Sequence, residues 1–265
     1  MTTASRPRPV SPTAQAVPPV PFRRLVRGEL RKTVDTRSGR WLVAAIGLVT
    51  VVAVVVAVVV AEPGSLTFRA VVGVTSAPQS LLLPVLAILA TTSEWSQRTA
   101  LITYTLEPDR TRVALAKLAA VVAIGLLAVV VALAVAAIGT AVGMPLAGGS
   151  DGWALSAADG RELVLTQVLA LLQATAFAML LMSTPAALVV YYLVPALWSS
   201  ALTLVDGLEP LAPWLDLGAA VRPLYSGGLP STGEWAQLAV AATLWLLLPM
   251  GVGLFRLVHR EVKAG

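Results

Sequence analysis

The feature that most constrains this chain is a set of long segments without any charged side chain. Residues 41–61 are 21 consecutive uncharged residues, and residues 163–205 are 43 without Asp, Glu, Lys, Arg or His. About 20 apolar residues in a helix cross the hydrocarbon core of a bilayer, because each adds about 1.5 Å. In lipid a lone strand would leave its backbone groups unpaired, so helices are expected in spite of the many valines. The sequence therefore predicts an all-α integral membrane protein.

The composition excludes several classes of function. Charged residues make up 12 % of the 265 residues, about half of the roughly 25 % found in water-exposed domains. Cysteine is absent and His259 is the only histidine, which excludes disulfides, thiol catalysis and clustered cysteine or histidine ligands. We expect no metal site. No glycine-rich loop followed by lysine is present, so the chain is expected to have no ATPase activity of its own and to bind no cofactor.

Six segments are expected to cross the membrane. The last uncharged stretch is long enough for two helices, and Ser183-Thr184-Pro185 is the predicted turn, with Ser183 or Thr184 as helix cap and the proline in the first turn. Residues 206–234 combine acidic residues, prolines and recurring leucines, which predicts a partly re-entrant segment before the last helix. The predicted spans are about 41–61, 70–92, 113–142, 163–183, 185–205 and 235–255.

The part of the chain before the first span has two regions. Residues 1–21 are rich in proline and small polar residues and are predicted to be a disordered tail that stays on the protein, because no signal-peptide pattern is present. Residues 22–40 are predicted to form an amphipathic helix in the lipid headgroup region, ahead of the six-span domain at 41–265. The alternative is a basic stretch without fixed structure. The predicted apolar side carries Phe22, Leu25, Val26, Leu30, Thr33 and Val34, and the basic side Arg23, Arg24, Arg27 and Arg31.

The distribution of positive charge predicts the orientation. All of the 19 Lys and Arg residues except Arg69, Arg161 and Arg222 lie before the first span, between the second span and the start of the third, or after the last. Positive charge next to membrane spans stays in the cytoplasm. Both termini are therefore predicted to be cytoplasmic, in the inner or plasma membrane of the cell. Because the basic residues lie beside apolar segments, we expect contacts with membrane lipids and none with nucleic acid.

The polar stretch from Glu94 to Lys117, together with two shorter motifs, resembles a known family. Glu29 to Lys32 reads E-L-R-K, Glu94 to Thr99 reads E-x-x-x-R-T, and Pro108 to Arg112 reads P-x-R-x-R, followed by Ala116-Lys117 at the start of the third span. Together with six spans and a segment that is partly re-entrant, this organisation is similar to the membrane subunit of ABC exporters of type 2. In that family the ATPase is a separate chain.

The resemblance implies specific partners and contacts. It implies two nucleotide-binding ATPase subunits, which bind ATP and Mg²⁺, and a dimer formed with a second copy or with a related permease, through the first and fifth spans. The loop would provide a coupling helix anchored by its apolar residues, with charged residues at the rim. The amphipathic helix would touch the same ATPase through Phe22, Leu25, Glu29 and Leu30. The implied coupling residues are Glu94, Arg98, Thr99, Leu101, Ile102, Leu106, Arg110 and Arg112.

A translocation path would be lined by neutral polar and aromatic residues. Hydrogen bonding between helices is the alternative for each of them. No ionisable side chain is expected at mid-depth, which argues against a proton-driven carrier. The other functions that remain open are a membrane sensor, resistance or immunity component that recruits a cytosolic partner, and a secondary carrier. The candidate path residues are Gln79, Gln173, Tyr191, Tyr192, Trp198 and Ser199.

Overall fold

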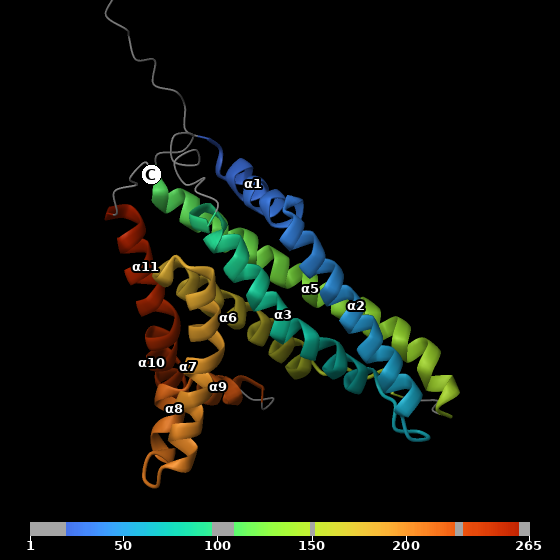
Figure 1. Ribbon diagram of the computed structural model, residues 1–265. Coiled ribbons are helices and arrows are strands. Elements are labelled where there is room, and N and C mark those ends of the chain that lie inside the picture. Colours follow the sequence, from blue (N-terminus) through green and yellow to red (C-terminus); the bar gives the residue numbers. More distant parts are fainter. Residues whose placement is uncertain (1–19, 97–108, 149–151, 226–229, 260–265) are drawn as a thin grey trace, which may run out of the picture.

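The chain folds into long helices (Figure 1). The computed structural model describes residues 20–96, 109–148, 152–225 and 230–259, and no strand occurs among them. Six helices are long and apolar enough to cross a membrane, which confirms the predicted all-α, six-span architecture. They are α2 (Arg37–Val60), α3 (Phe68–Ser96), α5 (Arg110–Leu146), α6 (Ala157–Leu181), α7 (Thr184–Leu204), and a last helix built from α10 (Thr232–Ala242), η3 (Thr243–Leu247) and α11 (Leu248–His259).

The long helices form two groups that diverge from one end of the molecule (Figure 1). Helices α2, α3 and α5 form one group, and α7, α10 and α11 form the other. Helix α6 lies between them and contacts α3, α5, α7 and α11. Its central residues Leu171 and Ala174 are buried with Ile88 of α3 in the main apolar core. Helix α5 approaches α6 closely at Gly125, where an added Cβ would lie 2.5 Å from a methyl carbon of Leu171.

The helices extend beyond the apolar segments that predicted them. Helix α5 starts at Arg110, because the Asp109 carboxylate accepts hydrogen bonds from the backbone nitrogens of Thr111 at 3.0 Å and Arg112 at 3.1 Å. Helix α6 starts at Ala157, six residues before the predicted span, because Ser156 and Asp159 cap each other. The spans were predicted from hydropathy, whereas the helices end where their backbone groups find other partners.

The turn between α6 and α7 lies where it was predicted. Met182 adopts a left-handed backbone conformation with φ of 50°, and α7 begins at Thr184 with Pro185 in its first turn. Ser183 occupies the predicted N-cap position, but its side chain makes no capping hydrogen bond. The Thr184 hydroxyl instead pairs with the Thr92 hydroxyl of α3 at 2.6 Å. The polar turn therefore ties α7 to the end of α3.

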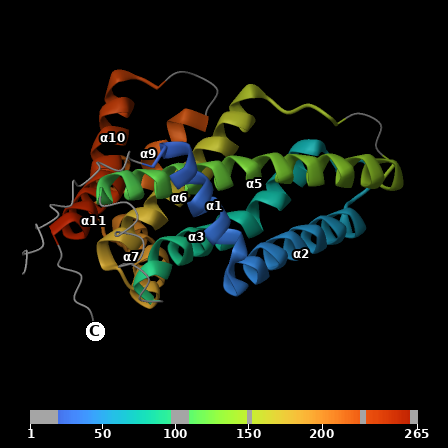
Figure 2. The same cartoon turned by 90° about the horizontal axis from the view of Figure 1, so that it is seen from above.

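Helix α1 (Phe22–Asp35) is shorter than the predicted segment 22–40. Thr36 is extended and caps the next helix, with its hydroxyl oxygen accepting from the backbone nitrogen of Gly39 at 3.1 Å. Residues 37–40 therefore belong to α2. Figure 2 shows α1 lying across α5, and the two helices are in contact.

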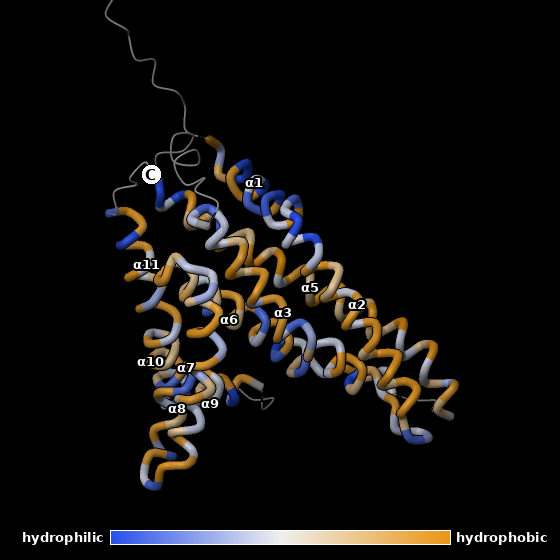
Figure 3. Tube along the Cα trace, in the orientation of Figure 1, coloured by the Kyte–Doolittle hydropathy of each residue, from blue (hydrophilic) through white to orange (hydrophobic). Residues whose placement is uncertain are grey.

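The segment before the last helix folds into short turns of helix. They are η1 (Glu209–Leu211), α8 (Ala212–Leu215), α9 (Leu217–Val221) and η2 (Arg222–Tyr225), and α8 and α9 pack against α10. Partial re-entry of this segment into the membrane stays a prediction. The last helix contains a π-helical turn at η3, which the sequence did not predict. In Figure 3 hydrophobic residues predominate along α2 and α5, and hydrophilic residues gather on α1, in part of α3 and near helix ends.

Candidate functional site

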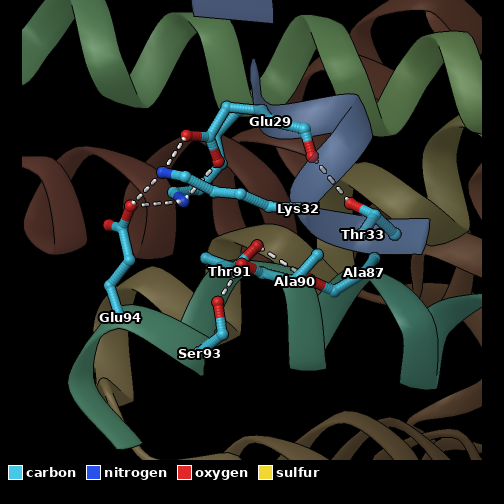
Figure 4. Close-up of polar contacts among 9 residues, drawn as sticks. Glu29, Lys32, Thr33, Ala87, Ala90, Thr91, Ser93 and Glu94 are labelled. Atoms are coloured by element: carbon cyan, nitrogen blue, oxygen red, sulfur yellow. Dashed lines mark hydrogen bonds and ion pairs between the residues drawn. The ribbon is translucent and has the colours of Figure 1, made fainter. Parts of the chain in front are cut away.

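Four charged side chains meet where α1 lies on α3 and α5. Glu29 and Lys32 come from α1, Glu94 from the end of α3 and Lys117 from the second turn of α5; we call this group the charge cluster. The Lys32 ammonium lies 2.7 Å from Glu29 Oε1 and 2.8 Å from Glu94 Oε1 (Figure 4). The Lys117 ammonium lies 2.6 Å from Glu29 Oε2 and 3.4 Å from Glu94 Oε1. Each ammonium thus bridges both carboxylates.

The charge cluster is electrically balanced and largely dry. The side chains of Glu29, Glu94 and Lys117 are at most 9 % exposed, whereas that of Lys32 is 44 % exposed. Buried charges are tolerated when each has an opposite partner and hydrogen bonds. Burial alone would lower the pKa of Lys32, but the carboxylates of Glu29 and Glu94 outweigh it and raise that pKa above its ordinary value. The Lys32 ammonium is therefore charged at neutral pH.

Glu29 and Glu94 make their ion pairs within the chain, and their contact with a soluble partner stays a prediction. Glu29 and Glu94 were predicted to contact a soluble partner, Glu94 at the rim of the loop. Their exposed fractions are 7 % and 3 %, and their carboxylates bind lysines of this chain. Glu94 lies within α3, so the segment between helices is shorter than the sequence suggested. The sequence contains both acids and both lysines, but no residue near them in the sequence indicates which acid pairs with which lysine.

The apolar residues of α1 lie on two sides of the helix. Leu25 and Leu30 are half-buried against the rest of the chain, and Phe22 is 43 % exposed. Glu29 and Thr33 are the most buried residues of α1, and the Thr33 hydroxyl donates to the Glu29 carbonyl at 3.0 Å. The side of α1 that faces the protein is therefore partly polar: Thr33 belonged to the predicted apolar side, and Glu29 did not.

Two arginines after the loop hold other parts of the chain. Arg110 donates from Nη1 to the carbonyl of Leu257 in α11 at 2.7 Å, and Arg112 donates from Nη2 to the carbonyl of Val20 at 2.7 Å. Both were predicted to contact a partner at the rim of the loop, and these bonds are within the chain. They fix the start of α5 to the two segments that lead to the chain ends.

The remaining coupling residues lie outside the described part of the chain. The structure describes α3 up to Ser96 and resumes at Asp109. The charge cluster and Arg110 hold the two helix ends that flank the gap. No group of three or more acidic or histidine residues that could bind a metal occurs in the described ranges. The predicted residues in the gap are Arg98, Thr99, Leu101, Ile102 and Leu106.

Two of the candidate path residues line one cavity. Gln173 of α6 and Ser199 of α7 face a cavity of about 310 Å³, whose wall also includes Asp216 and Trp245; we call it the α6–α7 cavity. The Trp245 indole, in the π-helical turn, donates to the carbonyl of Leu215 at 2.7 Å. The Trp198 indole donates to the same carbonyl at 3.0 Å. Trp198 thus holds the short helix α8 beside this cavity and is itself 39 % exposed.

The other candidate path residues make contacts between helices. Gln79 is 2 % exposed, and its amide nitrogen donates to the carbonyl of Ala128 in α5 at 3.2 Å. Tyr191 packs into the apolar core with its ring edge-on to Tyr192, at a centroid distance of 4.8 Å. The Tyr192 hydroxyl donates to the carbonyl of Leu81. These three residues therefore make contacts between helices, which was the alternative to lining a translocation path.

Comparisons with models of known protein families and with curated proteins found no match to this chain. The fold defines its class: the chain is an all-α, multi-pass membrane protein. These comparisons therefore indicate no substrate, partner or mechanism for the chain.

Proposed function

We propose that this chain is the permease subunit of an ATP-driven ABC exporter of type 2. The observation that carries the proposal is the charge cluster. It joins Glu29 and Lys32 of the E-L-R-K motif, Glu94 of E-x-x-x-R-T, and Lys117 after P-x-R-x-R. Residues that are 62 and 88 positions apart in the sequence form one ion network. The motifs behind the resemblance are thus parts of one structural unit.

This unit supports a coupling role for the segment between α3 and α5. A loop can transmit movement only if the helices that carry it are firmly connected to the rest of the protein. Glu94 and Lys117 connect both flanking helices to α1 through buried charges. In the proposal the loop lies in the cytoplasm and binds a nucleotide-binding subunit, which holds ATP and Mg²⁺. The basic residues of α1 and α5 at this end agree with the positive-inside rule.

The proposed dimer uses the first and fifth spans. These are α2 and α7, in which only 17 % and 11 % of the apolar window is buried, compared with 28–50 % in the other spans. They consequently have the most side-chain surface left for a second permease or for lipid. The α6–α7 cavity opens beside α7, with Gln173 and Ser199 in its wall, and is proposed as part of the translocation path. Its apolar and indole groups suit an amphipathic substrate.

The proposal is tested by isolating the protein with its partner. The tagged full chain is purified in mild detergent from its native membrane, and proteins present in stoichiometric amount are identified. We expect an ATPase of the ABC type. Leu101→Asp should remove it, because a carboxylate cannot enter an apolar groove of the partner. Leu101→Ile keeps the apolar contact and is the matched control. Arg98→Ala should retain the complex but lose most substrate-stimulated ATP hydrolysis.

The same experiment discriminates the other functions. If a kinase or a transcription regulator co-purifies and is lost on Leu101→Asp, the chain recruits a cytosolic regulator and is no permease. If the chain purifies alone and Leu101→Asp changes nothing, the coupling role is wrong and a secondary carrier becomes the better description.

A further inference from the structure

A polar cavity lies between α3 and α6, at the opposite end of α3 from the charge cluster. Its volume is about 370 Å³, and its walls include Arg69, Ser76 and Ser80 of α3 and Glu162 and Gln167 of α6; we call it the α3–α6 cavity. Arg69 and Glu94 are 25 residues apart on one helix, or about 37 Å. A Cβ added at Gly73 would meet no atom within 4 Å, so this part of the α3 wall is open.

The walls of the α3–α6 cavity present hydrogen-bond acceptors. The Ser76 hydroxyl donates to the carbonyl of Val72 at 2.8 Å and the Ser80 hydroxyl to that of Ala77 at 2.9 Å. Because each serine proton is used within the helix, the oxygen lone pairs remain for a ligand. The half-buried Glu162 carboxylate makes no ion pair with any described residue. These oxygens favour a donor with positive charge.

The second acid at the cavity is already neutralised. Asp159 caps α6 by accepting from the backbone nitrogen of Ser156 at 3.0 Å, and it forms an ion pair with Arg69 at 3.0 Å. The negative charge of Asp159 is therefore balanced by these partners at the start of α6. The carboxylate of Glu162 adds a negative charge that Arg69 does not balance, which disfavours an anionic ligand.

The wall of the cavity also contains the side-chain amide of Gln167. It lies ten residues into α6, about 15 Å along the axis, and is only 6 % exposed. Its amide nitrogen is buried and has no hydrogen-bond partner among the described residues. A buried amide without a partner is unfavourable, so such groups are usually satisfied by water or by a ligand. A ligand with an acceptor oxygen would satisfy it.

We propose that the α3–α6 cavity binds a cationic amphiphile, an amine that also carries a carbonyl or ether oxygen. The ammonium group lies between Glu162 and the serine oxygens, and the acceptor oxygen reaches the Gln167 amide. Val72, Leu155 and Leu163 cover the hydrocarbon part. The volume is in the range of cavities that hold small organic molecules, and it is too large for one bare metal cation. The binding site does not depend on the proposed ABC function.

The electrostatic part is tested with single cysteines, since the chain has none of its own. The full chain with Ser76→Cys is reconstituted in lipid nanodiscs. Separate samples are treated with two thiol reagents, a methanethiosulfonate that carries a trimethylammonium group and a methanethiosulfonate that carries a sulfonate group. The reporter control is Ser65→Cys, an exposed residue outside the cavity. We expect the ratio of the reaction rates with the cationic and the anionic reagent to be about tenfold higher at position 76 than at position 65. Glu162→Gln should remove most of this preference at 76 and leave 65 unchanged.

The ligand part is tested by protection from a neutral thiol reagent, methyl methanethiosulfonate. Procaine, an amine with an ester oxygen, should slow the reaction of Ser76→Cys severalfold, and benzocaine, an ester without the cationic amine, should not. Glu162→Gln should abolish the protection. Gln167→Leu should weaken it without changing the preference between charged reagents, because it removes the amide and keeps the carboxylate. Ser80→Cys provides a second reporter if Ser76→Cys is poorly inserted.

Three results would overturn the proposal. One is equal reactivity with both charged reagents, or a preference that Glu162→Gln leaves intact. Another is equal protection by procaine and benzocaine, which would show a merely apolar recess. The last is a thiol that reacts only after denaturation at both reporter positions, which would show that no ligand can enter. A missing ATPase in the purification described above has no bearing on these outcomes.

Discussion

Replacing Lys117 by Met should destabilise the protein more than replacing Lys32, the other lysine of the charge cluster, by Met. Lys117 lies 2.6 Å from Glu29 Oε2 and 3.4 Å from Glu94 Oε1, with its side chain 7 % exposed. At an effective dielectric constant of about 20, these attractions are each about 5–6 kcal/mol. Dehydrating the ions offsets several kcal/mol of this. Loss of Lys117 leaves a buried carboxylate uncompensated, and we expect a cost of about 3–5 kcal/mol.

The matched control is Lys32→Met, the same change in the same cluster. The Lys32 side chain is 44 % exposed, so water partly replaces its interactions, and we expect a cost of about 1 kcal/mol. Lys117→Arg retains the charge and should be intermediate. The double variant Glu29→Gln with Lys117→Met restores charge balance and should recover part of the loss. The free energy of unfolding is measured in mixed micelles by titration with a denaturing detergent, followed by circular dichroism.

A cost of about 1 kcal/mol or less for Lys117→Met, or a cost no larger than that of Lys32→Met, would contradict a buried ion network. Either result would mean that water reaches the Lys117 ammonium as readily as it reaches Lys32. The cluster would then be a surface ion network, and it would not attach α1 firmly to α3 and α5.

Two further variants test the packing of α11 and the titration of the charge cluster. Gly253→Val should destabilise the protein by about 1–3 kcal/mol, because a Cβ at Gly253 would lie 2.8 Å from backbone atoms of Met179 and Leu180. Gly251→Val is the control, since a Cβ there meets nothing within 4 Å, and equal costs in unfolding would contradict the contact. The Lys32 ammonium faces Glu29, Glu94 and Lys117, and its pKa is higher in the folded than in the unfolded protein. This shift stabilises the fold fully below the unfolded pKa of Lys32, near 10.5. The stabilisation is lost as the pH rises through the folded pKa. The difference in unfolding free energy between wild type and Lys32→Met should therefore be constant from pH 7 to about 9.5 and shrink only above that; a difference that shrinks below pH 9 would contradict the shift.

The number of spans followed from the sequence because a lipid environment leaves few alternatives. A stretch such as residues 41–61 has to form a helix, since only helices satisfy their own backbone groups in lipid. Pro185 also identified the turn before α7 correctly. The helix ends were less predictable, because they depend on caps such as Asp109 and Ser156, which lie outside the apolar segments.

The charge cluster and the two cavities were beyond prediction from one sequence. Glu94 looks like a loop residue because it is charged and lies just after an apolar segment. It stays in α3, buried, only because Lys32 and Lys117 arrive from two other helices. No residue near Glu94 in the sequence indicates these partners. In the same way, Gln167 and Ser76 come together only through the packing of α3 against α6.

The chemistry of the cluster explains how α1 can be held in one position. An apolar helix at the membrane surface gains little by choosing protein over lipid, since both are apolar, and it could slide along α5 at small cost. Ion pairs differ, because a shift of α1 by one residue would separate Glu29 from Lys117 and leave charges unpaired in a dry site. Two acids and two lysines therefore fix the register of α1 against α3 and α5. Leucines in the same places would hold α1 against α3 and α5 without defining its position along them.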